Sequence, residues 1–83
     1  MELRFHAHFV RGYASLTPEE QKQVDNALQR LVADPRYPSL QARKWDESTW
    51  YARASRDIRF FYESGEGHYL LLDVGHHDIE RGH

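Results

Sequence analysis

The sequence predicts an α+β fold: an N-terminal strand, a two-helix hairpin and a three-stranded antiparallel meander, with the helices packed on one face of the sheet. A polar–apolar alternation opens the chain, two segments with helical spacing follow, and the second half is rich in aromatic residues separated by glycine turns. With 83 residues, we expect a single domain, residues 1–83, around one hydrophobic core. The absence of cysteine excludes disulfides, thiolate metal sites and cysteine nucleophiles.

The first sixteen residues predict a short strand and a short helix. Residues 2–6 alternate between polar and apolar side chains, as strand residues do. Residues 7–16 place Phe9, Tyr13 and Leu16 on one face of a helix. This first helix is expected to pack that face against the sheet.

The second helix has a clear start and a clear end in the sequence. Thr17 can cap it, Pro18 suits the first helical position, and Glu20 completes a capping box. The residue before a proline avoids the helical region, so Asp34-Pro35 is expected to end the helix. Its apolar stripe consists of Val24, Ala27, Leu28 and Leu31.

The second half of the chain predicts a meander. Residues 36–49 are expected to form a loop, because Pro35, Pro38 and Ser39 mark turns. Residues 50–56 and 58–63 predict two strands joined by a tight turn around Asp57, and residues 68–75 predict a third. A hairpin turn is expected over residues 64–67, and two helices on one face of a mostly antiparallel sheet is the natural packing.

The charges are unevenly distributed along the chain. The formal net charge is −2, from 11 basic and 13 acidic residues. Acidic residues crowd positions 19–25, whereas five basic residues lie in the middle of the chain, and this asymmetry predicts either a local basic patch or scattered, solvated charge. The five are Arg43, Lys44, Arg53, Arg56 and Arg59.

No apolar run reaches the ~18 residues that span a membrane, so no membrane association is expected. The first residues lack the layout of a signal peptide. A cytoplasmic location is therefore expected.

Strand alternation sorts the side chains of residues 58–63 onto two faces. Ile58 and Phe60 fit the helix-covered face, so Arg59 and Phe61 stand on the open face, where Arg53 of the neighbouring strand can join them. Arginines on a sheet suit phosphate, because a guanidinium donates two parallel hydrogen bonds and stays charged. The alternative is that these arginines only keep the open face hydrated.

Three segments carry a resemblance to a known family. Residues 50–62, WYARASRDIRFFY, and residues 70–78, LLLDVGHHD, resemble the C-terminal half of RelE-type toxins. The predicted helix pair, which ends in LVADP at residues 31–35, resembles the usual N-terminal half. The most specific pieces are Asp57-x-Arg59 and the run Gly75 to Asp78. The resemblance covers nearly the whole chain and points to the RelE/ParE superfamily of type II toxin–antitoxin systems.

The resemblance implies a RelE-like fold and a metal-independent chemistry. RelE-like members enter the ribosomal A site and cleave mRNA by driving a ribose 2′-hydroxyl onto the adjacent phosphate, which needs proton transfer and a cation at the phosphate. By position, Arg59 matches the phosphate stabiliser, and His76 and His77 match the terminal proton-transfer positions. No cofactor is implied.

The same resemblance implies contacts to RNA and to partners. Arg53, Arg56, Arg43 and Lys44 would contact the RNA backbone, and Phe61 is the candidate for base stacking. Arg81 falls near a position where many members carry a tyrosine, and Ser39 falls roughly where some carry a glutamate base. The implied partners are a cognate antitoxin protein and mRNA on the ribosome.

Several alternatives remain open. A ParE-like inhibitor of DNA gyrase or a catalytically inactive antitoxin-binding module would share this fold, although a histidine pair favours the nuclease. His6 and His8 could join the histidines at residues 76–77 and Asp78 in a zinc or nickel site, but exposed histidines at strand ends are the simpler interpretation. Ser55, His77 and Asp78 are not expected to form a catalytic triad, because no nucleophile-elbow sequence surrounds any serine. Trp45 and Trp50 are expected to be edge and core aromatics rather than base-stacking platforms.

Overall fold

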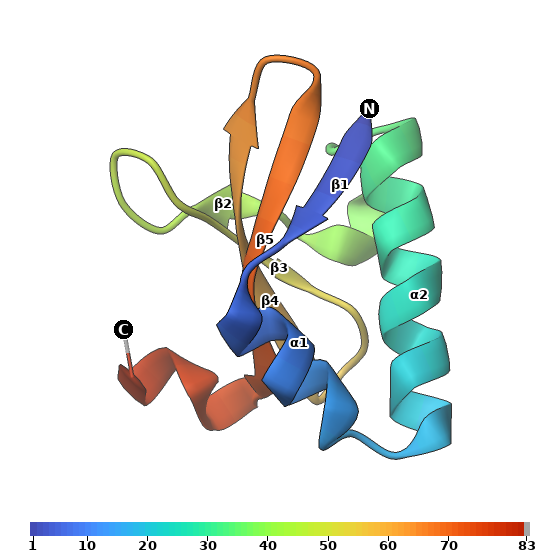
Figure 1. Ribbon diagram of the computed structural model, residues 1–83. Coiled ribbons are helices and arrows are strands. Elements are labelled where there is room, and N and C mark those ends of the chain that lie inside the picture. Colours follow the sequence, from blue (N-terminus) through green and yellow to red (C-terminus); the bar gives the residue numbers. More distant parts are fainter. Residues whose placement is uncertain (83) are drawn as a thin grey trace.

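The structure, a computed structural model, describes the backbone of residues 1–82 and the side chains of residues 1–79. The elements are β1 (Glu2–Phe5), α1 (Ala7–Ala14), α2 (Pro18–Ala33), the 3-10 helix η1 (Pro38–Leu40), β2 (Arg43–Lys44), β3 (Trp50–Arg53), β4 (Ile58–Gly65), β5 (His68–His76) and the 3-10 helix η2 (His77–Gly82). Strand, two helices and antiparallel meander follow one another as predicted, which confirms the α+β fold class (Figure 1).

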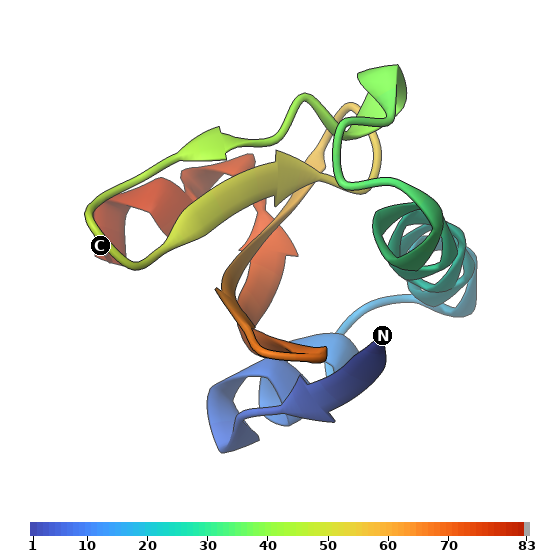
Figure 2. The same cartoon turned by 90° about the horizontal axis from the view of Figure 1, so that it is seen from above.

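The strands form one mixed sheet in the order β1-β5-β4-β3-β2. The three meander strands and β2 pair antiparallel, whereas β1 pairs parallel with β5. Seen from above, α2 lies on one side of the twisted sheet and η2 on the other (Figure 2). The side of the sheet opposite α2 is called the open face below.

The second helix begins as its sequence predicts. The Thr17 hydroxyl accepts from the Glu20 backbone N–H at 3.2 Å, and the Glu20 carboxylate accepts from the Thr17 backbone N–H at 2.9 Å. Two otherwise unpaired N–H groups of the first turn are satisfied in this way. The predicted capping box is confirmed, and α2 ends at Ala33, next to its C-cap Asp34.

Four predicted segments differ from the structure by two residues or more, and the predicted ends of β1 and β5 differ by one residue. The first helix ends at Ala14 rather than at residue 16, because Ser15 caps it and its hydroxyl donates to the Gly12 carbonyl at 2.9 Å. Strand β3 stops at Arg53, since residues 54–57 form the turn. Strand β4 runs on to residue 65, which leaves Glu66 and Gly67 as the hairpin turn, with Gly67 at φ 71°. The predicted loop 36–49 contains both η1 and β2.

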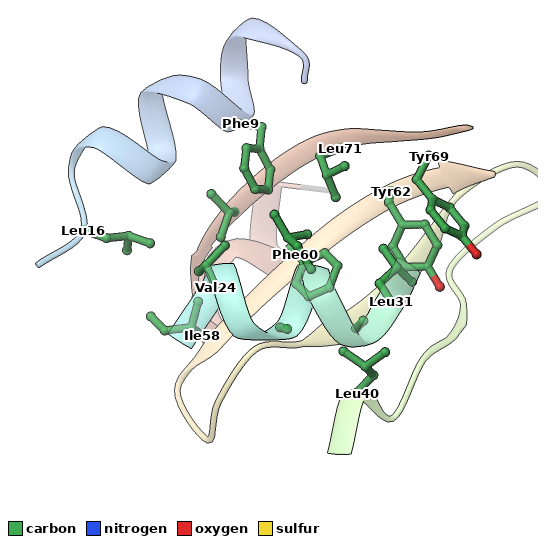
Figure 3. Close-up of a cluster of buried hydrophobic side chains, with 14 residues drawn as sticks. Phe9, Leu16, Val24, Leu31, Leu40, Ile58, Phe60, Tyr62, Tyr69 and Leu71 are labelled. Atoms are coloured by element: carbon green, nitrogen blue, oxygen red, sulfur yellow. The ribbon is translucent and has the colours of Figure 1, made fainter. Parts of the chain in front are cut away.

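One hydrophobic core lies between the helices and the sheet (Figure 3). Val24, Leu28 and Leu31 of α2 pack against Phe60 of β4 and Leu71 of β5. Of these, Val24, Leu31, Phe60 and Leu71 are completely shielded from solvent. The stripe predicted for the second helix is therefore the face that packs on the sheet.

Helix α1 lies against β5 at an unusually short distance. A Cβ atom at Gly12 would lie 2.3 Å from the Val74 carbonyl oxygen. Only glycine allows the two backbones to approach this closely. Phe9 of the same helix enters the core, so the glycine and the phenylalanine together hold α1 against the sheet.

Within residues 1–82, no helix is long and apolar enough to cross a membrane.

Candidate functional site

A cleft of about 320 Å³ opens on the open face of the sheet, at the end of β3 and the start of β4. We call it the arginine cleft, since four of its lining residues are arginines and a fifth is a histidine. It is lined by Gln41, Arg43, Tyr51, Ala52, Arg53, Arg56, Arg59 and His77. Five of the residues singled out in the sequence therefore come together.

Strand register explains why two of these arginines meet. Arg53 of β3 lies directly opposite Arg59 of β4 in the antiparallel ladder. Directly opposed like charges destabilise a sheet. No described carboxylate forms an ion pair with Arg53, Arg56 or Arg59. The three guanidinium charges are thus available to an anion that enters the cleft.

The guanidinium of Arg59 is held by the turn between β3 and β4. Its Nη1 donates to the Ser55 carbonyl at 2.7 Å and to the Ile58 carbonyl at 3.3 Å. The Ser55 hydroxyl accepts from the Ile58 N–H at 3.3 Å, so Ser55 supports the turn. These contacts orient Arg59 before a ligand arrives, which lowers the entropy lost on binding.

An aromatic cluster on the open face borders the cleft. Arg43 lies over the Tyr51 ring, 5.1 Å from its centroid. Trp45 packs against Tyr51 and edge-on against Phe61, with centroids 5.4 and 5.1 Å apart. Phe61 is on the open face, as alternation predicts, but it is fully buried beneath its neighbours. Its ring is therefore covered in this conformation, whereas Trp45 is only half-buried.

The two adjacent histidines lie on different sides of the sheet. His77 begins η2 and lines the arginine cleft. The Ile79 side chain of η2 lies over Gly75 of β5, where a Cβ atom at Gly75 would be 3.4 Å from it, so η2 packs against the open face beside the cleft. His76 is still in β5, and its Nε2 lies 3.4 Å from the Glu20 carboxylate at the start of α2.

Other residues from the sequence prediction lie elsewhere. Lys44 alternates to the opposite face from Arg43, with its Nζ 5.2 Å from the Trp50 ring centroid. Ser39 lies in η1. Arg81 lies in η2, and its side chain is outside the described residues.

The histidines near the N-terminus have a local structural role. The His6 side chain caps α1 by accepting from the His8 N–H at 3.1 Å, and the two rings stack at 4.9 Å. Among the described side chains, no three histidines, aspartates or glutamates gather in a way that would hold a metal ion.

Three lining residues were missed in the sequence, namely Gln41, Tyr51 and Ala52. Tyr51 shares the face of Arg53 by simple alternation, so the strand pattern contained the signal. Gln41 carries no such signal, because it follows a 3-10 helix and adopts a left-handed backbone at φ 47°.

No family model matches the sequence, and no curated protein matches it. Solved structures do match its fold. YafQ from E. coli strain BL21(DE3) superimposes with a TM-score of 0.78 at 8% identity, covering 95% of this chain and 96% of YafQ. The YoeB/ParE toxin from Agrobacterium tumefaciens superimposes with a TM-score of 0.77 at 15% identity, covering 93% of this chain and 99% of the toxin. A chain of the E. coli RelBE toxin–antitoxin complex superimposes with a TM-score of 0.71 at 16% identity, covering 89% of this chain and 93% of the other.

The chain thus has the fold of the RelE, YoeB and YafQ toxins over almost its whole length. The resemblance read from residues 50–62 and 70–78 is confirmed at the level of the fold.

Proposed function

We propose that this protein is the toxin of a type II toxin–antitoxin system and acts as a ribosome-dependent mRNA endoribonuclease in the cytoplasm. The observation that carries the proposal is that Arg59 and His77, which come from different elements, line the same cleft. The cleft combines guanidinium groups with an imidazole, which is the donor set that phosphate transesterification requires.

The reaction can be described atom by atom. The ribose 2′-oxygen attacks the adjacent phosphorus, the bond to the 5′-oxygen breaks, and a 2′,3′-cyclic phosphate forms with a free 5′-hydroxyl. One proton leaves the 2′-hydroxyl and one reaches the 5′-oxygen. Imidazole exchanges protons near neutral pH, so we assign to His77 the proton that the 5′-oxygen receives, while solvent water takes the proton of the 2′-hydroxyl on the opposite side of the phosphorus. Arg59 stabilises the charge that develops on the non-bridging oxygens, and Arg53 and Arg56 hold neighbouring phosphates.

His76 receives no part in this chemistry. Its ring is paired with Glu20 at the start of α2 rather than lining the cleft. We therefore propose a single catalytic histidine.

A cognate antitoxin is the expected partner. The structural neighbours include toxins solved as RelBE and DinJ–YafQ toxin–antitoxin complexes. Co-expression with the neighbouring open reading frame should yield a co-purifying complex and restore growth. A chain that is harmless alone and binds nothing encoded beside it would contradict the toxin role.

Single-turnover cleavage of mRNA on programmed ribosomes tests the chemistry. Arg59→Ala should lower the rate ~10²–10³-fold, because it removes a charge at the transition state. His77→Ala should lower it ~10²–10⁴-fold. Arg4→Ala is the matched control, since Arg4 pairs with Glu2 on the far edge strand. If Arg59→Ala and His77→Ala remain folded and toxic while DNA supercoiling fails before translation, gyrase inhibition replaces this proposal.

A further inference from the structure

A second and larger cleft, of about 490 Å³, lies on the helix side of the sheet, beyond the end of α2. We call it the aromatic cleft. Its walls include Tyr37, Pro38, Gln41, Trp50, Tyr62 and Tyr69. Three strands and the connection after α2 contribute these residues, and nothing in the proposed chemistry uses them.

Two hydroxyl groups point into this space. The rings of Tyr62 and Tyr69 are buried, and their hydroxyl oxygens point the same way, away from the rest of the core (Figure 3). Neither hydroxyl hydrogen-bonds to a described residue, and neither is sealed from solvent. Burial raises the pKa of Tyr62 to about 12 and also raises the pKa of Tyr69, so both stay protonated at neutral pH. The cleft therefore offers two hydrogen-bond donors to a ligand.

The aromatic cleft also offers a stacking surface with positive charge near it. The Trp50 ring lies nearly parallel to Tyr62, with an interplanar angle of 13° and centroids 6.4 Å apart. Trp50 is only half-buried. Arg36 lines the same cleft and is almost fully exposed, with its Nε 4.0 Å from the Asp34 carboxylate, and the Lys44 ammonium lies over the Trp50 ring. A planar ligand that bears hydrogen-bond acceptors and lies close to phosphate fits this combination.

Gln41 connects the two clefts. It lines both of them, and its Oε1 accepts a hydrogen bond from Arg53 Nη1 at 2.9 Å. Its backbone is the one non-glycine case of positive φ within residues 1–82, at 47°. A side chain in this region costs free energy, and such strain concentrates at binding sites. The chain crosses the edge of the sheet at this point, between the arginine cleft on one face and the aromatic cleft on the other.

We propose that the aromatic cleft is a base-binding subsite for single-stranded RNA, which takes one unstacked base while the arginine cleft holds the phosphates beside it. The base stacks on Trp50, and its carbonyl or ring-nitrogen acceptors receive hydrogen bonds from Tyr62 and Tyr69. The inference rests on the proposed function, because it takes single-stranded RNA as the ligand. The proposed subsite adds a base-dependent contact to the phosphate contacts of the arginine cleft. This contact lies on the helix side of the sheet, opposite the proposed catalytic residues.

Binding to the purified protein tests this without ribosomes or cleavage. The probes are five-residue 2′-O-methyl oligonucleotides of each base, in which the 2′-hydroxyl cannot attack. Nuclear magnetic resonance follows the Trp50 indole N–H as reporter of the aromatic cleft and the Arg53 and Arg59 Nε–H groups as reporters of the arginine cleft. We expect at least one base to shift both sets of signals. An abasic pentamer with the same phosphates should shift the arginine signals alone and bind ~5–150-fold more weakly.

Tyrosine variants isolate the hydrogen-bond contribution. Tyr69→Phe removes one donor and keeps the ring, so base-containing pentamers should bind ~2–13-fold more weakly while the abasic pentamer binds as before. Tyr13→Phe is the matched control, because its hydroxyl bonds to Asp25 on α2, outside both clefts. The Trp50→Leu variant should bind every base-containing pentamer only as tightly as the abasic pentamer. If Trp50→Leu does not fold, Tyr69→Phe supplies the test.

Three outcomes would overturn the inference. In the first, the abasic pentamer shifts the Trp50 signal as far as the base-containing pentamers do, and in the second, Tyr69→Phe and Tyr13→Phe bind the base-containing pentamers with equal affinity. In the third, no oligonucleotide shifts the Trp50 signal, whereas a co-purifying protein partner does. A chain that binds pentamers through both clefts but cleaves no mRNA on ribosomes contradicts only the ribonuclease proposal. A chain that cleaves mRNA but leaves the Trp50 signal unmoved contradicts only the base subsite.

Discussion

Replacement of Arg59 by glutamine removes one of three cleft charges that have no described carboxylate partner. Arg53 and Arg56 remain, so the expected change in RNA binding is partial rather than complete. The variant also loses the hydrogen bond from Nη1 to the Ser55 carbonyl. Circular dichroism and a urea midpoint are needed beside the binding measurement, because this bond supports the turn between β3 and β4.

The magnitude follows from the number of phosphates neutralised. Each contact to a single strand contributes about −0.7 to the slope of log K against log salt concentration. Three guanidinium groups therefore predict a slope of about −2 for the unmodified protein, and Arg59→Gln should reduce it to about −1.4. A hydrogen bond to a charged group is worth ~1.5–3 kcal/mol, so affinity at low salt should fall ~10–150-fold.

Fluorescence anisotropy of a labelled 2′-O-methyl pentanucleotide over a salt series measures both quantities. Arg4→Gln removes the same charge from the edge strand, where Arg4 pairs with Glu2 at 2.8 Å, and should keep the slope of the unmodified protein. An unchanged slope in folded Arg59→Gln would refute the assignment of the arginine cleft as the phosphate site. Equal reductions in both variants would show that net charge, rather than the cleft, attracts the RNA.

Three further predictions concern the fold that holds the clefts. Gly12→Ala should lower the free energy of unfolding by ~1–3 kcal/mol, because the new Cβ would lie 2.3 Å from the Val74 carbonyl oxygen; an unchanged urea midpoint would show that α1 can move away at no cost. Leu31→Ala should cost ~2–5 kcal/mol in the same assay, whereas Val32→Ala, at a position 37% exposed, should cost well under half as much. The Glu20 pKa lies below its ordinary value of 4.5, chiefly because the carboxylate accepts from the Thr17 backbone N–H. The ionised Glu20 carboxylate therefore contributes to the free energy of unfolding above its ordinary pKa, and this contribution is lost as pH falls through the lowered pKa of the folded protein. Between pH 7 and about pH 3, the free energy of unfolding should therefore fall less in Glu20→Gln than in the unmodified protein. An equal fall in both proteins would contradict the role of this carboxylate.

Features that depend on near neighbours could be read from the sequence. The start of α2 rests on Thr17 and Glu20, three residues apart, and both bonds of the capping box are present. Alternation placed Arg59 on the open face, and the opposed register then brought Arg53 beside it. Helix and strand periods are properties of the local backbone, which is why these predictions needed no knowledge of distant segments.

Only the tertiary structure decided that residues adjacent in the sequence, such as Arg43 and Lys44 or His76 and His77, lie on opposite faces of the sheet. Arg43 lines the arginine cleft while Lys44 lies over Trp50, because residues 43 and 44 pair with β3 as a two-residue strand too short to show a period. His76 and His77 lie on different sides of the sheet because β5 ends between them. After that point the Ile79 side chain of η2 lies over Gly75 on the open face. These positions depend on segments distant in the chain, whose packing against one another no local pattern encodes.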